Sequence, residues 1–231
     1  MRKAVVTGAS SGIGNAIAQR LLQLGYSVIG VSRNISPSSI QNENFHAIKT
    51  DLSSQKELQS LCDKLKKEKI FLLIHSAGFG VFQPHEELSP QTIIDMTYVN
   101  LTAPMLLTNA LLRELKEQNG YLININSIEA LRSSKFSGVY SATKTGLKAF
   151  GDALFEETRK SGLSITNINP DMTESSFYDS LQFSTSQKED EKLFASDIAD
   201  AVEHILTMRK GAVVSEYTVR SLKFAIVKKK L

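Results

Sequence analysis

The chain has 231 residues, of which 42% are hydrophobic and 22% charged, and its formal net charge is +3. These values are ordinary for a soluble globular protein with one sizeable core, and so small and dispersed a charge gives no indication of nucleic-acid binding. With one cysteine, four histidines in no zinc-binding pattern and no run of about 20 apolar residues, we expect no disulfide, no metal, no membrane span and a cytoplasmic location.

Short apolar runs alternate with longer helical patterns along the chain. Strands are predicted over 3–7, 26–32, 45–50, 70–76, 120–127, 163–169 and 212–219, and most of these runs are apolar throughout. Helices are predicted over 14–25, 53–68, 90–118, 140–160 and 195–208. Continuously apolar strands are typical of a parallel sheet with helices on both faces. The sequence therefore predicts an α/β fold, a doubly wound parallel sheet of about seven strands in a single domain over residues 1–231.

One segment, about 173–195, interrupts this alternation. It is polar and follows Pro170. It is also long for a simple connection, and such loops are often functional. We interpret it as a flexible lid over a substrate, with a solvated surface excursion as the competing interpretation.

A glycine-rich turn, TGASSGIG, follows the first predicted strand and opens the first helix, with Gly8, Gly12 and Gly14 in it. A backbone that passes close to a pyrophosphate cannot carry Cβ atoms at the points of approach, and unpaired N–H groups at a helix start attract the anion. Asn15 stands where an ATP or GTP loop has its lysine, which disfavours those nucleotides. The turn therefore indicates a dinucleotide site, with a turn that binds no ligand as the alternative.

The second predicted strand ends in VSRN, near the place where a carboxylate would bind the ribose 2′-hydroxyl of NAD. This stretch contains no acid, and Arg33 offers a planar set of donors suited to a 2′-phosphate. NADP(H) is therefore the predicted cofactor. An arginine at a strand end is also often a solvated cation, so the prediction depends on its position after the glycine turn.

At this point the chain resembles the short-chain dehydrogenases/reductases along nearly its whole length. TGASSGIG matches the family's cofactor turn, the pair Asp51 and Leu52 its adenine contact, and SAG at 76–78 its N-A-G motif. The last predicted strand is similar to that of the small NADP-dependent carbonyl reductases. The resemblance implies a Rossmann-type fold and these cofactor-binding residues: Gly8, Ser10, Ser11, Gly12, Ile13, Gly14, Arg33, Asp51, Leu52, Ser76, Ala77, Gly78, Tyr140, Lys144, Pro170 and Thr173.

The ordered series Asn100, Ser127, Tyr140 and Lys144 matches the family's catalytic set. Reduction of a carbonyl by hydride needs a proton donor within reach of the oxygen, and Tyr140 can supply that proton. Lys144 lies one helical turn further on the same face, so its charge is expected to lower the pKa of the phenol. Ser127 can donate a hydrogen bond to the substrate oxygen. The resemblance further implies that Lys144 holds the nicotinamide ribose and that Asn100 binds a water in a proton relay.

Two positions depart from the family pattern. Ser76 stands in place of the usual asparagine, and Asp171 follows Pro170 where glycine is frequent. The sequence is uninformative about specificity, although Arg132 or Lys135 could meet a carboxylate or phosphate. The residues expected around the substrate are Leu131, Arg132, Lys135, Phe136, Phe177 and Tyr178.

The function predicted from these residues is NADPH-dependent reduction of a ketone or aldehyde of a small molecule, with the proton from Tyr140. One alternative keeps the chemistry and reverses it, as an NADP-dependent dehydrogenase of a small hydroxy acid or alcohol in vivo. Another is a catalytically silent NADP(H)-sensing protein, which would not need the proton donor. The resemblance also implies a homodimer or homotetramer that pairs through the long helices predicted over 90–118 and 140–160.

Overall fold

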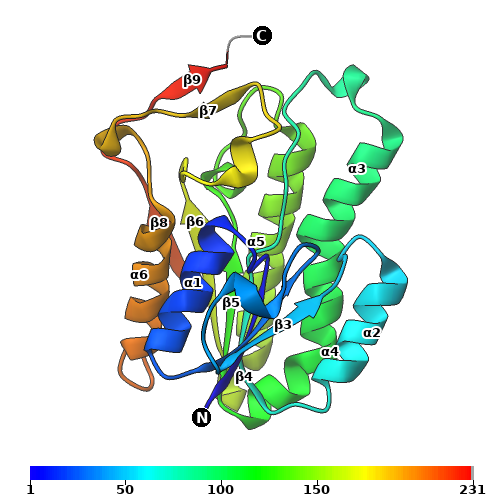
Figure 1. Cartoon of the computed structure of the whole chain (residues 1–231), viewed down its shortest axis with the longest axis vertical. Helices are drawn as coiled ribbons and strands as arrows, with labels where there is room; N and C mark the ends of the chain where they lie inside the picture. Colours follow the sequence, from blue (N-terminus) through cyan, green and yellow to red (C-terminus); the bar gives the residue numbers. More distant parts are fainter. Residues whose placement is uncertain (230–231) are drawn as a thin grey trace.

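The fold is a seven-stranded parallel sheet between two layers of helices, seen in a computed structural model that describes residues 1–229 (Figure 1). Residues 230 and 231, the end of the predicted domain, lie outside the described part. The strand order is β3-β2-β1-β4-β5-β6-β8, which confirms the predicted doubly wound sheet. The strands are β1 (Lys3–Thr7), β2 (Ser27–Ser32), β3 (Phe45–Lys49), β4 (Ile70–His75), β5 (Tyr121–Ile125), β6 (Ser164–Pro170) and β8 (Glu216–Val219).

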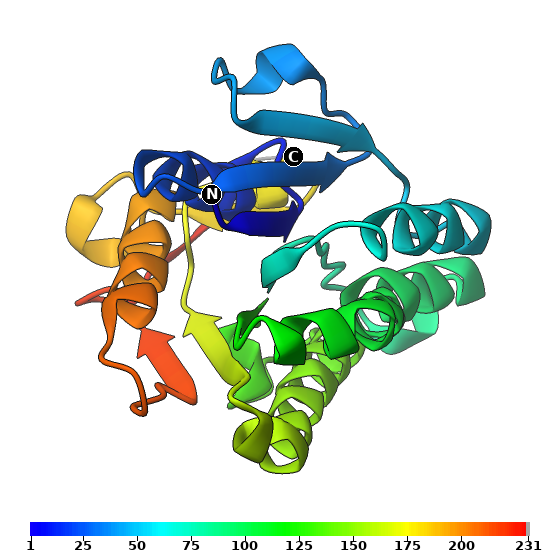
Figure 2. The ribbon, with the colours of Figure 1, turned by 90° about the horizontal axis from the view of Figure 1, so that it is seen from below.

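The helices divide between the two faces of this sheet (Figure 2). Helices α1 (Gly12–Gln23) and α6 (Ala195–Thr207) pack against each other on one face. The other face is covered by α2 (Gln55–Leu65), α4 (Ala103–Glu117) and α5 (Gly138–Thr158), with α3 (Pro90–Thr97) beside α5. Along β1, Ala4 and Val6 enter the core beneath α1 and α6, whereas Val5 enters the core on the opposite face. Because both strand faces are buried, the runs are apolar without alternation.

The helix predicted over 90–118 is not continuous. A π-helical turn, Tyr98–Thr102, separates α3 from α4, and the N–H of Ala103 donates to the carbonyl of Tyr98. Pro104 accounts for the change, because it has no N–H to donate to the carbonyl of Asn100, four residues earlier. Such π turns are frequent at functional sites, and this one contains Asn100.

The segment 173–195 is folded over the carboxyl ends of the strands (Figure 1). It contains a short strand, β7 (Phe183–Thr185), that pairs antiparallel with β9 (Ile226–Lys228) near the end of the chain. Neither strand is among those predicted from the sequence. A bridge between Thr173 and Leu193 joins the two ends of the segment.

Candidate active site

A cleft of about 480 Å³ opens at the carboxyl ends of β1, β2 and β4. This edge of a parallel sheet is where α/β proteins bind ligands. Most of the residues predicted to bind the cofactor line it: Gly8, Ser10, Ser11, Gly12, Ile13, Gly14, Arg33, Asp51, Leu52, Ser76, Ala77 and Gly78. The predicted residues Tyr140, Lys144, Pro170 and Thr173 lie outside this lining. Lining residues that the sequence did not indicate include Thr50, Asp95, Val99 and Ser175.

The glycine turn has the close packing that a pyrophosphate site needs. Gly8 has a φ of +71°, and a Cβ on it would lie 2.9 Å from the Cα of Ala77. A Cβ on Gly14 would lie 2.3 Å from the carbonyl oxygen of Gly8. Helix α1 begins at Gly12 and directs its first N–H groups toward the cleft side of the turn. The backbone here therefore fits the phosphates of a dinucleotide.

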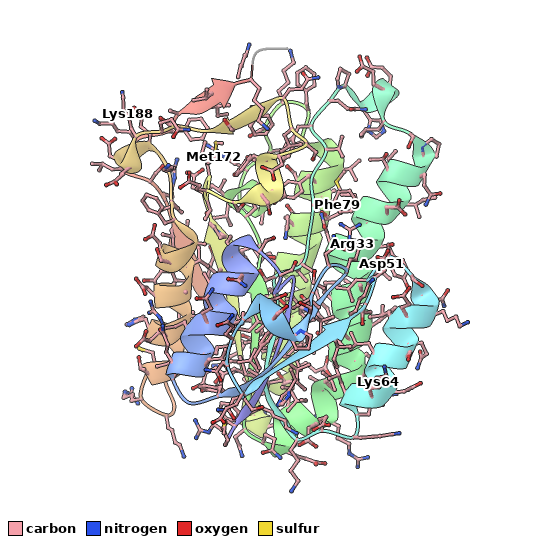
Figure 3. All side chains as sticks on the ribbon, viewed as in Figure 1. Arg33, Asp51, Lys64, Phe79, Met172 and Lys188 are labelled. Atoms are coloured by element: carbon pink, nitrogen blue, oxygen red, sulfur yellow. The ribbon has the colours of Figure 1, made fainter. Side chains whose placement is uncertain are left out.

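Arg33 and Asp51 both line the cleft and lie close to each other, below Phe79 in the view of Figure 3. The Asp51 carboxylate accepts hydrogen bonds from the backbone N–H of Ser53 at 2.9 Å and its hydroxyl at 2.8 Å. Burial raises the pKa of Asp51, but these bonds and the charge of Arg33 leave it below its ordinary value. The Arg33 side chain is exposed and forms no ion pair with any side chain of residues 1–229.

The 76–78 loop is held to β1 by a side chain that sequence reasoning assigned no role of its own. The backbone N–H groups of Ser76 and Ala77 donate to the hydroxyl of Thr7, at 3.0 and 3.1 Å, and that hydroxyl donates to the carbonyl of Ile74. Thr7 therefore links β1 to the end of β4. These bonds use the backbone of residue 76, so they do not depend on which side chain stands there.

The fold brings together three of the predicted catalytic residues beside the cleft. Ser127 follows β5, whereas Tyr140 and Lys144 lie on α5. Ser127 lies close enough to Tyr140 for its side chain to lower the pKa of the phenol. The Ser127 hydroxyl also accepts the N–H of Glu129 at 3.1 Å. The ammonium of Lys144 donates to the carbonyl of Ile125 at 2.9 Å and lies 5.9 Å from the centre of the Tyr140 ring. Tyr140 and Lys144 are both buried.

Asn100 connects the 76–80 loop to α5. Its amide donates to the carbonyl of Phe79 at 2.9 Å and to the hydroxyl of Thr143 at 3.2 Å, while its side-chain oxygen accepts the N–H of Phe79 at 3.1 Å. A Cβ on Gly78 would lie 3.1 Å from that oxygen and 3.4 Å from the Lys144 nitrogen. Asn100 is fully buried and thus fixes the loop next to Lys144.

The electrostatics differ from the sequence-based expectation that Lys144 lowers the pKa of Tyr140. The pKa of Tyr140 is raised to about 12, mainly by burial; the side chain of Ser127 lowers it and the charge of Glu129 raises it, and both effects are smaller. Burial lowers the pKa of Lys144 to about 8. Loss of solvation is therefore the main cause of the pKa shift of both Tyr140 and Lys144.

Glu129, a buried carboxylate whose charge acts on Tyr140, was not among the predicted site residues. Glu129 accepts hydrogen bonds from the N–H of Ser134 at 2.8 Å and its hydroxyl at 2.7 Å, and from the hydroxyls of Ser137 and Ser141, both at 3.2 Å. It also pairs with Arg132 at 3.4 Å. Burial raises the pKa of Glu129, but the hydrogen bonds more than offset this and leave it below its ordinary value. Glu129 thereby ties the loop after β5 to the start of α5.

Replacing Glu129 with glutamine should lower the free energy of unfolding by about 2 kcal/mol at pH 7, because an amide cannot accept all of these bonds. A group whose pKa is lowered on folding stabilises above its unfolded pKa, here 4.5, and loses that effect as pH falls through the folded value. Urea titrations should therefore show the difference from wild type shrinking below pH 4.5. Glu156→Gln, at an exposed position of α5, is the control. Equal stability of Glu129→Gln and wild type at pH 7 would refute this role.

The other predicted residues separate into three groups. Thr173 and Pro170 are buried, and the Thr173 hydroxyl donates to the carbonyl of Asp171 at 2.9 Å. Leu131 and Phe136 are each 45% exposed at the surface. Phe177 and Tyr178, in contrast, lie beside Tyr140 in a cluster of rings.

The described residues contain neither a cluster of candidate metal ligands nor a helix able to span a membrane. Within residues 1–229, no three His, Cys, Asp or Glu side chains are grouped so that they could hold a metal ion. In the same range, every helix is too short or too polar to cross a bilayer.

Comparison with known proteins assigns the family. The family model described as short chain dehydrogenase matches residues 2–184. An uncharacterized oxidoreductase of Staphylococcus epidermidis is 31% identical over 224 residues, which cover 94% of this chain and 96% of the relative. The chain therefore belongs to the short-chain dehydrogenase family and is an oxidoreductase.

Solved structures of similar shape support the same assignment. An alcohol dehydrogenase from the archaeon Thermococcus sibiricus complexed with 5-hydroxy-NADP is 27% identical, with a TM-score of 0.85 and coverage of 96% of this chain and 97% of that one. A 4-hydroxyisoleucine dehydrogenase complexed with NADH is 21% identical, with a TM-score of 0.83 and coverage of 96% and 98%, and shares the fold. The family assignment supports an enzyme that acts on CH–OH or C=O groups.

Proposed function

We propose that this protein is an NADPH-dependent reductase of ketones or aldehydes of small molecules. The observation that carries the proposal is that Tyr140 is buried beside Ser127 and Lys144, at the sheet edge where the glycine-lined cleft opens. A protein that only binds a nucleotide needs the cleft but no proton donor beside it. The alternative of a silent NADP(H) sensor is therefore disfavoured.

Each residue has a role in this reaction. The cofactor supplies the hydride to the carbonyl carbon when it is bound. Tyr140 donates its proton to the carbonyl oxygen as negative charge develops there. Ser127 already accepts the N–H of Glu129, which leaves its own O–H free to donate to the same oxygen. Lys144, whose ammonium lies 5.9 Å from the centre of the Tyr140 ring, would hold the nicotinamide ribose, and Asn100 holds the loop that borders Lys144.

Purified protein mixed with NADPH and a panel of aldehydes and ketones should oxidise the nicotinamide, seen as loss of its absorbance. Binding of NADPH without turnover of any carbonyl would favour the sensor. Faster reaction of an alcohol or hydroxy acid with NADP than of any carbonyl with NADPH would favour the dehydrogenase direction.

The preference for NADP(H) rests on Arg33. Its guanidinium is exposed on the cleft lining and has no ionic partner among residues 1–229, so it is available to a 2′-phosphate. Asp51 lies nearby, but its carboxylate is already engaged by Ser53.

Replacing Arg33 with alanine should weaken NADPH binding by about 30-fold, the range of a lost charge-assisted hydrogen bond. Binding of NADH should change by less than about twofold, because NADH has no 2′-phosphate. Fluorescence titrations with both nucleotides measure the two affinities. Lys64→Ala, which removes an exposed positive charge on α2, controls for net charge. An equal loss for both nucleotides would remove the 2′-phosphate role.

We also propose that residues 173–195 form a lid. Ser176 donates a hydrogen bond to the hydroxyl of Ser11 at 3.0 Å, and the Cβ of Ser175 lies 3.0 Å from where a Cβ of Gly12 would be. Phe177 lines the cleft as well. The segment thus touches the glycine turn directly, and it must move for a nucleotide to enter or leave.

We further propose that the protein is a homo-oligomer in the cytoplasm. Ile94 on α3 and Leu106 on α4 are 57% and 44% exposed, which supports pairing through these helices in a homodimer or homotetramer. Cys62 is a free, buried thiol and is compatible with a cytoplasmic location.

A further inference from the structure

A cluster of aromatic rings surrounds the tyrosine that the proposed reaction uses. Phe82 lies 5.2 Å and Phe177 5.8 Å from the Tyr140 ring, measured between centroids. Phe183 lies 5.3 Å from Phe82, and Tyr178 lies 5.2 Å from Phe177. The rings come from the loop after β4, from α5 and from the segment 173–195, so the tertiary fold assembles them.

The rings of this cluster form a closely packed apolar surface around Gly80. A Cβ on Gly80 would lie 2.7 Å from the Phe82 ring, 2.9 Å from the Phe177 ring and 3.1 Å from the Tyr140 ring. Tyr140 is only 6% exposed, whereas Phe82, Phe177 and Phe183 are half-buried and keep part of each ring accessible. A carbonyl oxygen that receives the Tyr140 proton must lie within hydrogen-bonding reach of its hydroxyl. The groups attached to that carbonyl then contact these rings.

The charges around the cluster disfavour an anionic substrate. Glu129 and Asp171 are buried carboxylates, and their charges act on Tyr140 and Tyr178, respectively. Arg132, a candidate partner for a substrate carboxylate, lies 3.4 Å from Glu129, 3.9 Å from Asp171 and over the ring of Phe224. Its charge is therefore compensated by the protein.

The other cations near the cluster are also in contact with groups of the protein. Asp171 also pairs with Arg220 at 3.1 Å, so that guanidinium is engaged as well. The ammonium of Lys135, the other candidate, lies over the exposed ring of Phe136. Lys144 is the cation next to Tyr140, and its ammonium is bound to the carbonyl of Ile125.

We propose that the substrate is a neutral carbonyl compound with a flat aromatic substituent that packs among Phe82, Phe177 and Phe183. This inference rests on the proposed reductase function and specifies its substrate class. Aromatic rings prefer edge-to-face or offset contacts with other rings, as the side chains of the cluster already make with one another. A small hydroxy acid or oxo acid would bring a carboxylate near the buried carboxylates Glu129 and Asp171.

The test compares carbonyl compounds on the full-length protein with NADPH. Benzaldehyde and 4-carboxybenzaldehyde differ in charge but little in carbonyl reactivity, because an ionised para-carboxylate withdraws few electrons. We expect kcat/KM to be at least about tenfold higher for benzaldehyde than for 4-carboxybenzaldehyde, and at least about 100-fold higher for the activated neutral aldehyde 4-nitrobenzaldehyde than for pyruvate, an aliphatic oxo acid. Equal or faster turnover of the anionic or aliphatic compounds would overturn the aromatic assignment and leave the reductase function intact. No turnover of any carbonyl would instead refute the reductase function itself.

Variants locate the effect in the cluster. Phe82→Ala and Phe183→Ala should each raise KM for 4-nitrobenzaldehyde at least about fivefold and leave KM for NADPH within about twofold, because neither ring lines the nucleotide cleft. Phe183→Tyr, which keeps the ring, should restore most of the loss. Phe224→Ala, at a half-exposed ring outside the cluster, should leave both KM values unchanged. Unchanged KM for the aldehyde in both alanine variants would show that the rings only close the site and would refute the proposal.

Discussion

Replacing Tyr140 with phenylalanine is expected to lower kcat for carbonyl reduction by about 1,000-fold, within the range that general acid catalysis contributes. The ring remains, so its contacts with Phe82 and Phe177 persist and the variant should fold. Only the hydroxyl is lost. Steady-state rates from NADPH absorbance, with a fluorescence titration of NADPH, separate the loss of chemistry from a loss of binding.

The control is Tyr121→Phe, which removes a phenol from β5 next to Phe71, away from the cleft. It should keep the wild-type rate. If Tyr140→Phe retained full activity with NADPH bound, Tyr140 could not be the proton donor.

The same assignment predicts how the two directions depend on pH. Burial raises the pKa of Tyr140 to about 12, so the hydroxyl is protonated at neutral pH and ready to donate during reduction. Oxidation of an alcohol needs the phenolate, whose fraction increases as pH rises toward the pKa. Reduction should therefore vary little with Tyr140 ionisation near neutral pH, and oxidation should become faster with rising pH.

The sheet could be predicted from the sequence because its strands are buried on both faces. Continuous apolar runs such as 70–76 admit few other interpretations when they alternate with helical patterns. The glycine turn was recognisable for a similar reason, since one local motif contains both the strand end and the helix start. Most of the nucleotide cleft could therefore be assigned from sequence.

Features that depend on contacts far apart in the chain could not be predicted. Strand β9 pairs with β7 across some forty residues, and its Ile226 and Val227 are exposed, so neither strand has a buried apolar pattern. The π turn at Asn100, in contrast, had a local signal, because Pro104 lies in the interior of the helix predicted over 90–118 and cannot donate a backbone hydrogen bond there.

The prediction that Lys144 lowers the pKa of Tyr140 was wrong for a related reason. The spacing of Tyr140 and Lys144 places them on one face of a helix, which the structure bears out. Spacing does not report burial, and burial dominates the pKa of both groups. The charge of Glu129 adds to this effect, and its approach depends on the fold of the loop after β5.

Replacing Gly14 with alanine is expected to have the largest effect on cofactor binding. A Cβ there would lie 2.3 Å from the carbonyl oxygen and 2.7 Å from the carbonyl carbon of Gly8. Both are backbone atoms, so relief requires the turn itself to move, and overpacking of this kind costs about 3 kcal/mol. Gly8 cannot move freely, because a Cβ on it would already approach Ala77 at 2.9 Å.

Displacing this turn should misalign the N–H groups that face the phosphates and weaken NADPH binding by at least about 100-fold. Thermal unfolding followed by circular dichroism, together with an NADPH titration below the melting temperature, measures the two consequences separately. Gly138→Ala is the matched control, because a Cβ at Gly138 meets no atom of the described residues within 4 Å. It should bind NADPH as wild type does. If Gly14→Ala behaved like this control in both measurements, the turn would not be the close approach on which nucleotide binding depends.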